Sequence, residues 1–175
     1  MLERPALLLR PWEPATRPHR SRVILDARTG DALGVARELP ISWPVGLRWL
    51  AGTALAVYET EDESLLCTVR RLWRWDARPV WGTRDADGHE IGRIRHSASL
   101  RVWPAFVAWD RQNCPVARWS PRLTGDRLAG AESSVDVGNL HVTEDGLYLT
   151  FADVPQNDPF ARMLILTAAL TSDLR

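Results

Sequence analysis

The sequence predicts a mostly β fold, a β-barrel wrapped around one buried C-terminal α-helix. From Arg22 onward, short apolar runs alternate with turn residues, a pattern typical of all-β domains. The end of the chain changes to a helical run that is apolar on every face, and such a helix has to be buried on all sides. A short helix of this kind after many short strands indicates a barrel that encloses it.

The first segment, residues 1–21, is rich in proline and arginine. Prolines stand at positions 5, 11, 14 and 18, and proline cannot donate a hydrogen bond to a sheet. We therefore expect an N-terminal arm over residues 1–21, or an edge segment, and one domain over residues 22–175.

Alternation of apolar residues with a period of two marks the strands of the predicted barrel. Asp145-Gly146 adds a strong hairpin turn, because glycine adopts the positive φ that such a turn needs. The predicted strands are Val23–Asp26, Ala54–Glu59, Leu65–Arg70, Val80–Arg84, Phe106–Trp109, Ser133–Val137 and Leu147–Phe151.

An internal repeat predicts that one kind of hairpin is used three times. Each copy has an aspartate, then a turn residue, then an apolar residue followed by a small one. Aspartate caps a turn through its own backbone, and a small residue suits a place where another backbone comes close. A calcium loop at Asp85-x-Asp87-Gly88 is the less favoured interpretation, because an EF-hand glycine stands at the sixth position. The copies are Asp26–Ala36, Asp85–Ile94 and Asp110–Trp119, with turn and small residues at Gly30 and Gly34, Gly88 and Gly92, Asn113 and Ala117.

The C-terminal helix is expected from Asp158, a good N-cap, through Pro159 at the first helical position to about Ser172. About 15 residues would span roughly 22 Å, too short for a bilayer core of about 30 Å. We expect Met163, Ile165, Leu166 and Leu170 to be almost fully buried.

Composition limits the function classes. The chain has 175 residues, 22 basic and 22 acidic, so its formal net charge of zero argues against a nucleic-acid binder. All the basic residues are arginine, which a GC-rich genome explains more simply than phosphate binding does. The beginning of the chain lacks a signal-peptide core, and Cys67 and Cys114 form no metal-ligand spacing. We expect a cytoplasmic protein with reduced thiols.

No residue set meets the demands of a known catalysis. His19, His89, His96 and His141 stand without HExxH spacing, and the chain has no GxSxG motif and no glycine-rich phosphate loop. The sequence therefore predicts a non-enzymatic protein with no cofactor, no catalytic residue and no metal site.

The chain resembles the tubby C-terminal-like superfamily, which includes tubby domains, phospholipid scramblases and LURP-one-related proteins. The resemblance covers about residues 22–175 and is carried by the hairpins Asp26–Ala36 and Asp85–Ile94, by Phe106–Asp110 and by the ending LYLTFADVPQNDPFARMLILTAALTSDL. It implies a closed antiparallel barrel of about twelve strands with the terminal helix threaded through its centre.

The functions within that superfamily differ, so the fold does not carry one of them over. Tubby domains bind phosphoinositides, scramblases are linked to calcium and lipid movement, and many relatives have no assigned role. The scramblase calcium motif would place ligands at Thr143, Asp145 and Leu147, and only the aspartate could bind a hard cation.

Arginine and tryptophan interleave at Arg48-Trp49, over residues 70–75, at Arg101 with Trp103 and at Arg118-Trp119. The run over residues 70–75 supplies the candidate lipid-binding site: Arg70, Arg71, Trp73, Arg74 and Trp75. Tryptophan favours the headgroup region and arginine binds phosphate, so this strip could hold an anionic membrane surface and make the protein a peripheral membrane protein. The commoner arrangement packs the tryptophans in the barrel wall, with arginines stacked on them. Two functions stay open: a module that binds anionic phospholipid, and a protein-interaction or structural domain with no small-molecule ligand.

Overall fold

The computed structural model describes residues 1–11, 21–39, 53–72, 80–97, 105–119, 127–129, 136–152 and 158–171. Within these ranges the chain forms twelve strands and one helix. The strands are β1 (Ala6–Pro11), β2 (Ser21–Asp26), β3 (Ala32–Glu38), β4 (Ala54–Glu59), β5 (Leu65–Leu72), β6 (Val80–Asp85), β7 (Glu90–Ser97), β8 (Ala105–Asp110), β9 (Pro115–Trp119), β10 (Arg127–Ala129), β11 (Asp136–Thr143) and β12 (Gly146–Phe151), and the helix is α1 (Pro159–Thr171).

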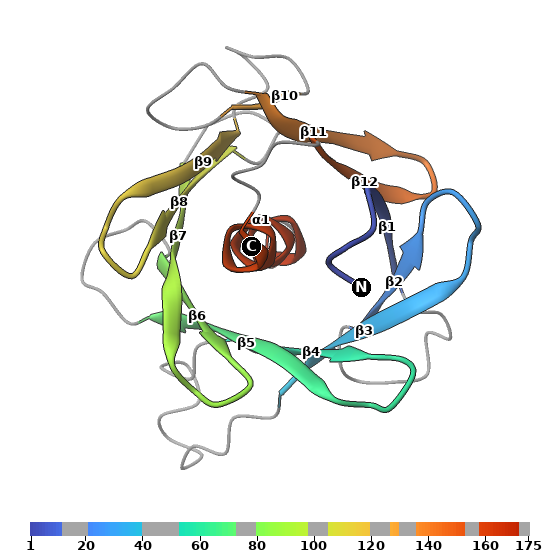
Figure 1. The fold of residues 1–175 in the computed structure, drawn as a ribbon, viewed down its shortest axis with the longest axis horizontal. Coiled ribbons are helices and arrows are strands. Elements are labelled where there is room, and N and C mark those ends of the chain that lie inside the picture. The colour runs from blue at the N-terminus through green and yellow to red at the C-terminus, as the bar shows by residue number, and fades with distance from the viewer. Residues whose placement is uncertain are drawn as a thin grey trace.

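The strands form one closed antiparallel barrel in which each strand pairs with its neighbours in the sequence and β1 pairs with β12 (Figure 1). The predicted mostly β barrel around a C-terminal helix is therefore confirmed. Closure leaves no unpaired edge, which removes the usual risk that exposed strands pair with other chains.

The N-terminal strand corrects the predicted arm. β1 lies between β12 and β2, with Leu8 opposite Tyr148 on one side and Leu25 on the other. Leu7 and Leu9 are fully buried. The prolines at positions 5 and 11 flank or end this strand instead of interrupting it, so residues 6–11 belong to the barrel. Residues 12–20 lie outside the described residues.

The helix α1 occupies the centre of the barrel (Figure 1). Ile165, Leu166 and Leu170 are buried as predicted, whereas Met163 is only partly buried because it lies in the first turns of the helix. Asp158 caps the helix, since its Oδ1 accepts a hydrogen bond from the backbone N–H of Phe160 at 3.1 Å. The helix packs most closely against β7, β8, β9 and β12.

Two polar contacts join the buried helix to the wall. Thr83 Oγ1 lies 3.3 Å from Thr167 Oγ1, and His96 Nε2 lies 2.9 Å from Thr171 Oγ1. The Thr171 hydroxyl also lies 2.8 Å from the carbonyl oxygen of Thr167, the residue one turn earlier in the helix. These directional bonds add rotational and axial specificity to apolar packing, which is not directional.

The three predicted hairpins are present and a fourth joins them, but the prediction of one kind of hairpin is only partly right, because the turns differ in length. In all four hairpins the register shifts directly before the turn, and a residue of positive φ follows an acidic residue at the strand end. The turns have two lengths, the first two being one residue longer, yet the small residue always stands four positions after the residue of positive φ. The residues of positive φ are Gly30, Glu63, Gly88 and Asn113, and the small residues are Gly34, Cys67, Gly92 and Ala117.

The small residues face the interior, and all four are buried. A methyl group added at Gly92 would overlap the carbonyl oxygen of Trp109 and press on Leu164 of the central helix. At Gly34 the same change would overlap the carbonyl oxygen of Tyr58. The repeat thus places a residue of minimal size where a neighbouring strand or the helix comes close, as the sequence predicted.

In the part of the chain that the structure describes, α1 is the one helix, and its 13 residues are too few to cross a membrane.

Candidate anion-binding surface

Four residues from four consecutive strands form one row on the outer face of the barrel. In the strand register Arg70 lies opposite Gly82, Gly82 opposite Arg93, and Arg93 opposite Trp109. The residues that precede or follow them in their strands, such as Val69 and Ile94, are buried, so alternation directs the row outward. Since neighbouring strands lie about 4.8 Å apart, the backbones of Arg70 and Arg93 are about 10 Å apart.

A second outward row runs beside the first. It contains Leu72, Val80, Arg95, Val107 and Arg118, each opposite the next in the register from β5 to β9. Val80 is buried, and Arg95 and Val107 are partly buried, so this row offers Leu72 and Arg118 to solvent. Arg118 is exposed and Leu72 is 37% exposed. The Leu72 side chain leans over Gly82, where a methyl group would lie 3.3 Å from Leu72 Cδ2. The basic wall, defined here as Arg70, Leu72, Arg93, Trp109 and Arg118, therefore combines three arginines with two apolar side chains.

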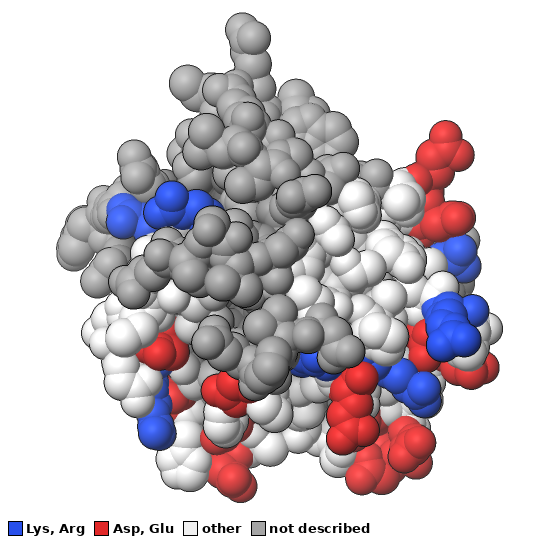
Figure 2. Space-filling view, turned by 45° about the horizontal axis from the view of Figure 1, so that its top comes forward, with Lys and Arg blue, Asp and Glu red and all other residues white. Residues whose placement is uncertain are grey.

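Acidic residues on these strands stand at one end, next to the turns. Glu90 forms an ion pair with Arg93, with the carboxylate Oε1 2.7 Å from the guanidinium Nε. Both side chains are exposed, so this pair contributes little to stability and the arginine can exchange it for another anion. Figure 2 shows charges of both signs along the lower and right edges of the described surface, and a group of basic side chains on its left flank.

The structure describes two of the five predicted lipid-binding residues, Arg70 and Arg71, and both are exposed at the end of β5. They point to opposite faces of the strand, since Arg70 joins the outer row and Arg71 lies opposite the buried Trp81. The other three, Trp73, Arg74 and Trp75, lie outside the described residues.

The described tryptophans divide between the two faces of the barrel. Trp81 and Trp119 are 2% and 1% exposed and fill the interior, the arrangement that wall packing predicts. Trp109 is partly exposed on the outer face, opposite Arg93. Of the described tryptophans, Trp109 is thus the one that the outer surface offers to a partner.

Sequence reasoning missed Arg93 and Trp109, and it noted Arg118 only as part of an arginine–tryptophan pair. The proximity of all three to Arg70 depends on the register of other strands. The repeat held a usable signal. Arg93 and Arg118 each follow the small residue of their hairpin directly, and alternation turns that position outward.

No protein-family model, curated protein or solved structure matches this chain.

Proposed function

We propose that this protein is a non-enzymatic module that binds an anionic phospholipid surface through the basic wall. The observation that carries the proposal is the outer row in which Arg70 and Arg93 flank Gly82, with Trp109 beside Arg93 and Leu72 over the glycine. Arginine forms bidentate contacts with phosphate, and tryptophan and leucine suit the apolar side of a headgroup region.

The expected binding is weak and reversible. Each basic group near an anionic membrane contributes about 1 kcal/mol, and the attraction fades within a Debye length of about 10 Å. Arg70, Arg93 and Arg118 together would give about 3 kcal/mol, with a further contribution from Trp109 and Leu72 at the interface. Binding of this kind falls as salt increases.

The resemblance to the tubby C-terminal-like superfamily supports the same proposal. The central helix in a closed twelve-stranded barrel is the architecture that the resemblance implies. Members of that superfamily include phosphoinositide-binding proteins and proteins linked to lipid movement. Because one fold supports many functions, the outer-row arginines carry the proposal and the resemblance adds to it.

Vesicle co-sedimentation tests the proposal. The native chain should bind vesicles that contain phosphatidylserine at low salt, and it should bind them less at about 0.15 M salt. It should not bind vesicles of pure phosphatidylcholine. The Arg70→Ser, Arg93→Ser, Arg118→Ser variant loses three charges of the basic wall and should partition about 100-fold more weakly. The matched control is Arg10→Ser with Arg28→Ser, two arginines outside β5–β9, of which Arg10 forms only an exposed ion pair with Asp145.

Equal binding by the triple variant and the native chain would contradict the proposal. So would the absence of binding to anionic vesicles at low salt. Either result would favour the protein-interaction or structural role, with which the net charge of zero agrees.

A further inference from the structure

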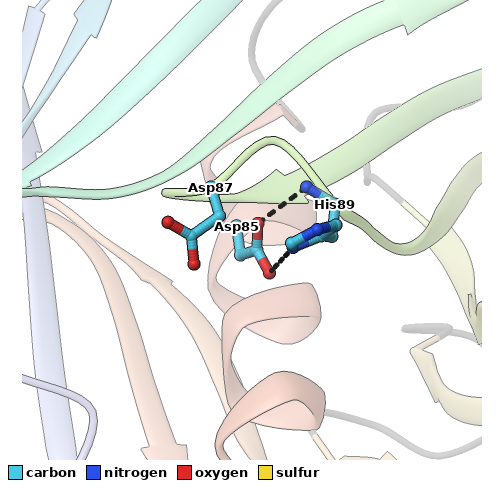
Figure 3. Close-up of side chains that lie close together, drawn as sticks. All are labelled: Asp85, Asp87 and His89. Atoms are coloured by element: carbon cyan, nitrogen blue, oxygen red, sulfur yellow. Dashed lines mark hydrogen bonds and ion pairs between the residues drawn. The ribbon is translucent and has the colours of Figure 1, made fainter.

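The turn between β6 and β7 gathers three side chains that can each donate a ligand to a metal ion. Asp85, Asp87 and His89 offer ligand atoms that all lie within 4.8 Å of one another. Asp85 and His89 are in direct contact, and Asp87 lies beside them on the same turn (Figure 3). Asp87 and His89 are exposed, so a hydrated ion can reach the group from solvent.

The turn itself requires only one of these side chains. Asp85 Oδ1 accepts a hydrogen bond from the backbone N–H of His89 at 2.8 Å. In the turn between β8 and β9, Asp110 Oδ1 does the same for Cys114 at 2.8 Å, and Gln112 stands where Asp87 stands. That turn has the same length and the same positive-φ position without a carboxylate or an imidazole at these places. Capping therefore does not explain Asp87 and His89.

The donors match a borderline transition metal better than a hard cation. An imidazole nitrogen with carboxylate oxygens suits Zn²⁺, Ni²⁺ or Cu²⁺, whereas Ca²⁺ and Mg²⁺ prefer oxygen alone. Ligands about 2.1 Å from a tetrahedral zinc lie about 3.4 Å apart. His89 Nδ1 and Asp85 Oδ2 are 3.5 Å apart, and Asp87 can close the remaining distance because its side chain is exposed.

The local charge also favours a cation. Between residues 84 and 93 the acidic groups are Asp85, Asp87 and Glu90, and the basic ones are Arg84 and Arg93, which leaves an excess of one negative charge. Arg93 is paired with Glu90 at 2.7 Å, so its charge is partly neutralised before it can oppose an ion. The second oxygen of Asp85, Oδ2, is not used by the backbone of the turn.

We propose that Asp85, Asp87 and His89 form a surface site for a divalent transition-metal ion of the zinc class, with water completing the coordination. Three protein ligands from one turn leave positions open, so the site exchanges its ion readily. This site is separate from the basic wall, and its test does not depend on membrane binding.

Calorimetric titration of the tag-free chain with Zn²⁺ at neutral pH tests the proposal, together with NMR of the histidine rings. One ion should bind per chain and shift the ring signals of His89. His89→Ala should weaken binding at least tenfold, and Asp87→Asn should weaken it less, because the amide keeps one neutral oxygen. The side chains of Asp87 and His89 are exposed, and neither takes part in the hydrogen bond by which Asp85 caps the turn. The two variants should therefore have the same melting temperature as the native chain.

Asp31→Asn is the matched control, since Asp31 is an exposed carboxylate in the turn between β2 and β3. It should leave zinc affinity unchanged. The proposal is overturned if Zn²⁺ does not saturate a single site, or if His89→Ala binds as tightly as the native chain. Ca²⁺ binding at this site that is as tight as Zn²⁺ binding and indifferent to His89→Ala would overturn the assigned class of ion.

Discussion

The inner and outer faces of the same strands differ in what they contribute. On β7 the inward residues Gly92, Ile94 and His96 pack against the central helix or bond to it. The outward Arg93, one residue from two of them, forms an exposed ion pair. Close packing on the inside makes each substitution costly, whereas the outer face accepts charge without affecting the fold. Fold and candidate function can therefore be changed separately.

The largest expected effect on stability comes from a substitution in the interior of the barrel. Leu166→Ala removes a fully buried side chain from the helix at the centre of the barrel. The cavity should lower the free energy of unfolding by about 2–5 kcal/mol, which urea denaturation measures. A loss below about 1 kcal/mol would mean that the helix does not occupy the closely packed centre.

A pair of glycines on neighbouring strands compares the two faces directly. Gly92→Ala places a methyl group against the carbonyl of Trp109 and should cost about 1–3 kcal/mol. Gly82→Ala on the outer face meets only the half-exposed Leu72 side chain, which can move, so the change should stay within about 0.5 kcal/mol. Similar losses for both variants would remove the distinction between the faces.

The two cysteines should differ in their reactivity toward alkylating reagents. Burial raises the pKa of the Cys67 thiol to about 12, whereas Cys114 is exposed on the turn after β8. Alkylation at about pH 8 followed by mass spectrometry should find one adduct, at Cys114. Cys67 ionises more readily in the unfolded chain, from its ordinary value of 9.0, so its contribution to stability declines as pH rises from 9.0 toward about 12. Rapid modification of Cys67 in the folded chain would contradict its burial.

The sequence predicted those parts of the fold that have a local signal. The periodicity of the apolar residues marked the strands and the helix. The pattern of an aspartate, a turn residue and a small residue marked three of the four hairpins that belong to the repeat. The fourth was missed because Glu63 takes the positive φ that glycine or asparagine takes elsewhere, and glutamate is not a usual residue for that conformation. β1 was missed because prolines at positions 5 and 11 indicated an arm, although its pairing partners leave those positions outside the strand interior.

The candidate surface was only half predictable. Arg70 and Arg71 were evident as neighbours in the sequence, but Arg93, Trp109 and Arg118 join Arg70 only through a succession of strand pairings from β5 to β9. Which tryptophans face inward also depends on a register that no single strand specifies.

Site-directed spin labelling tests most directly whether the outer face is the contact surface. A nitroxide at Leu72→Cys in a Cys114→Ser background reports from within the basic wall, because the buried Cys67 does not react. A label at Arg28→Cys, in the exposed turn between β2 and β3, is the control. On addition of phosphatidylserine vesicles at low salt, the label at position 72 should lose mobility and gain exposure to membrane-dissolved oxygen, while the label at position 28 should not change. An unchanged label at position 72, in a chain that still sediments with the vesicles, would contradict the proposed surface.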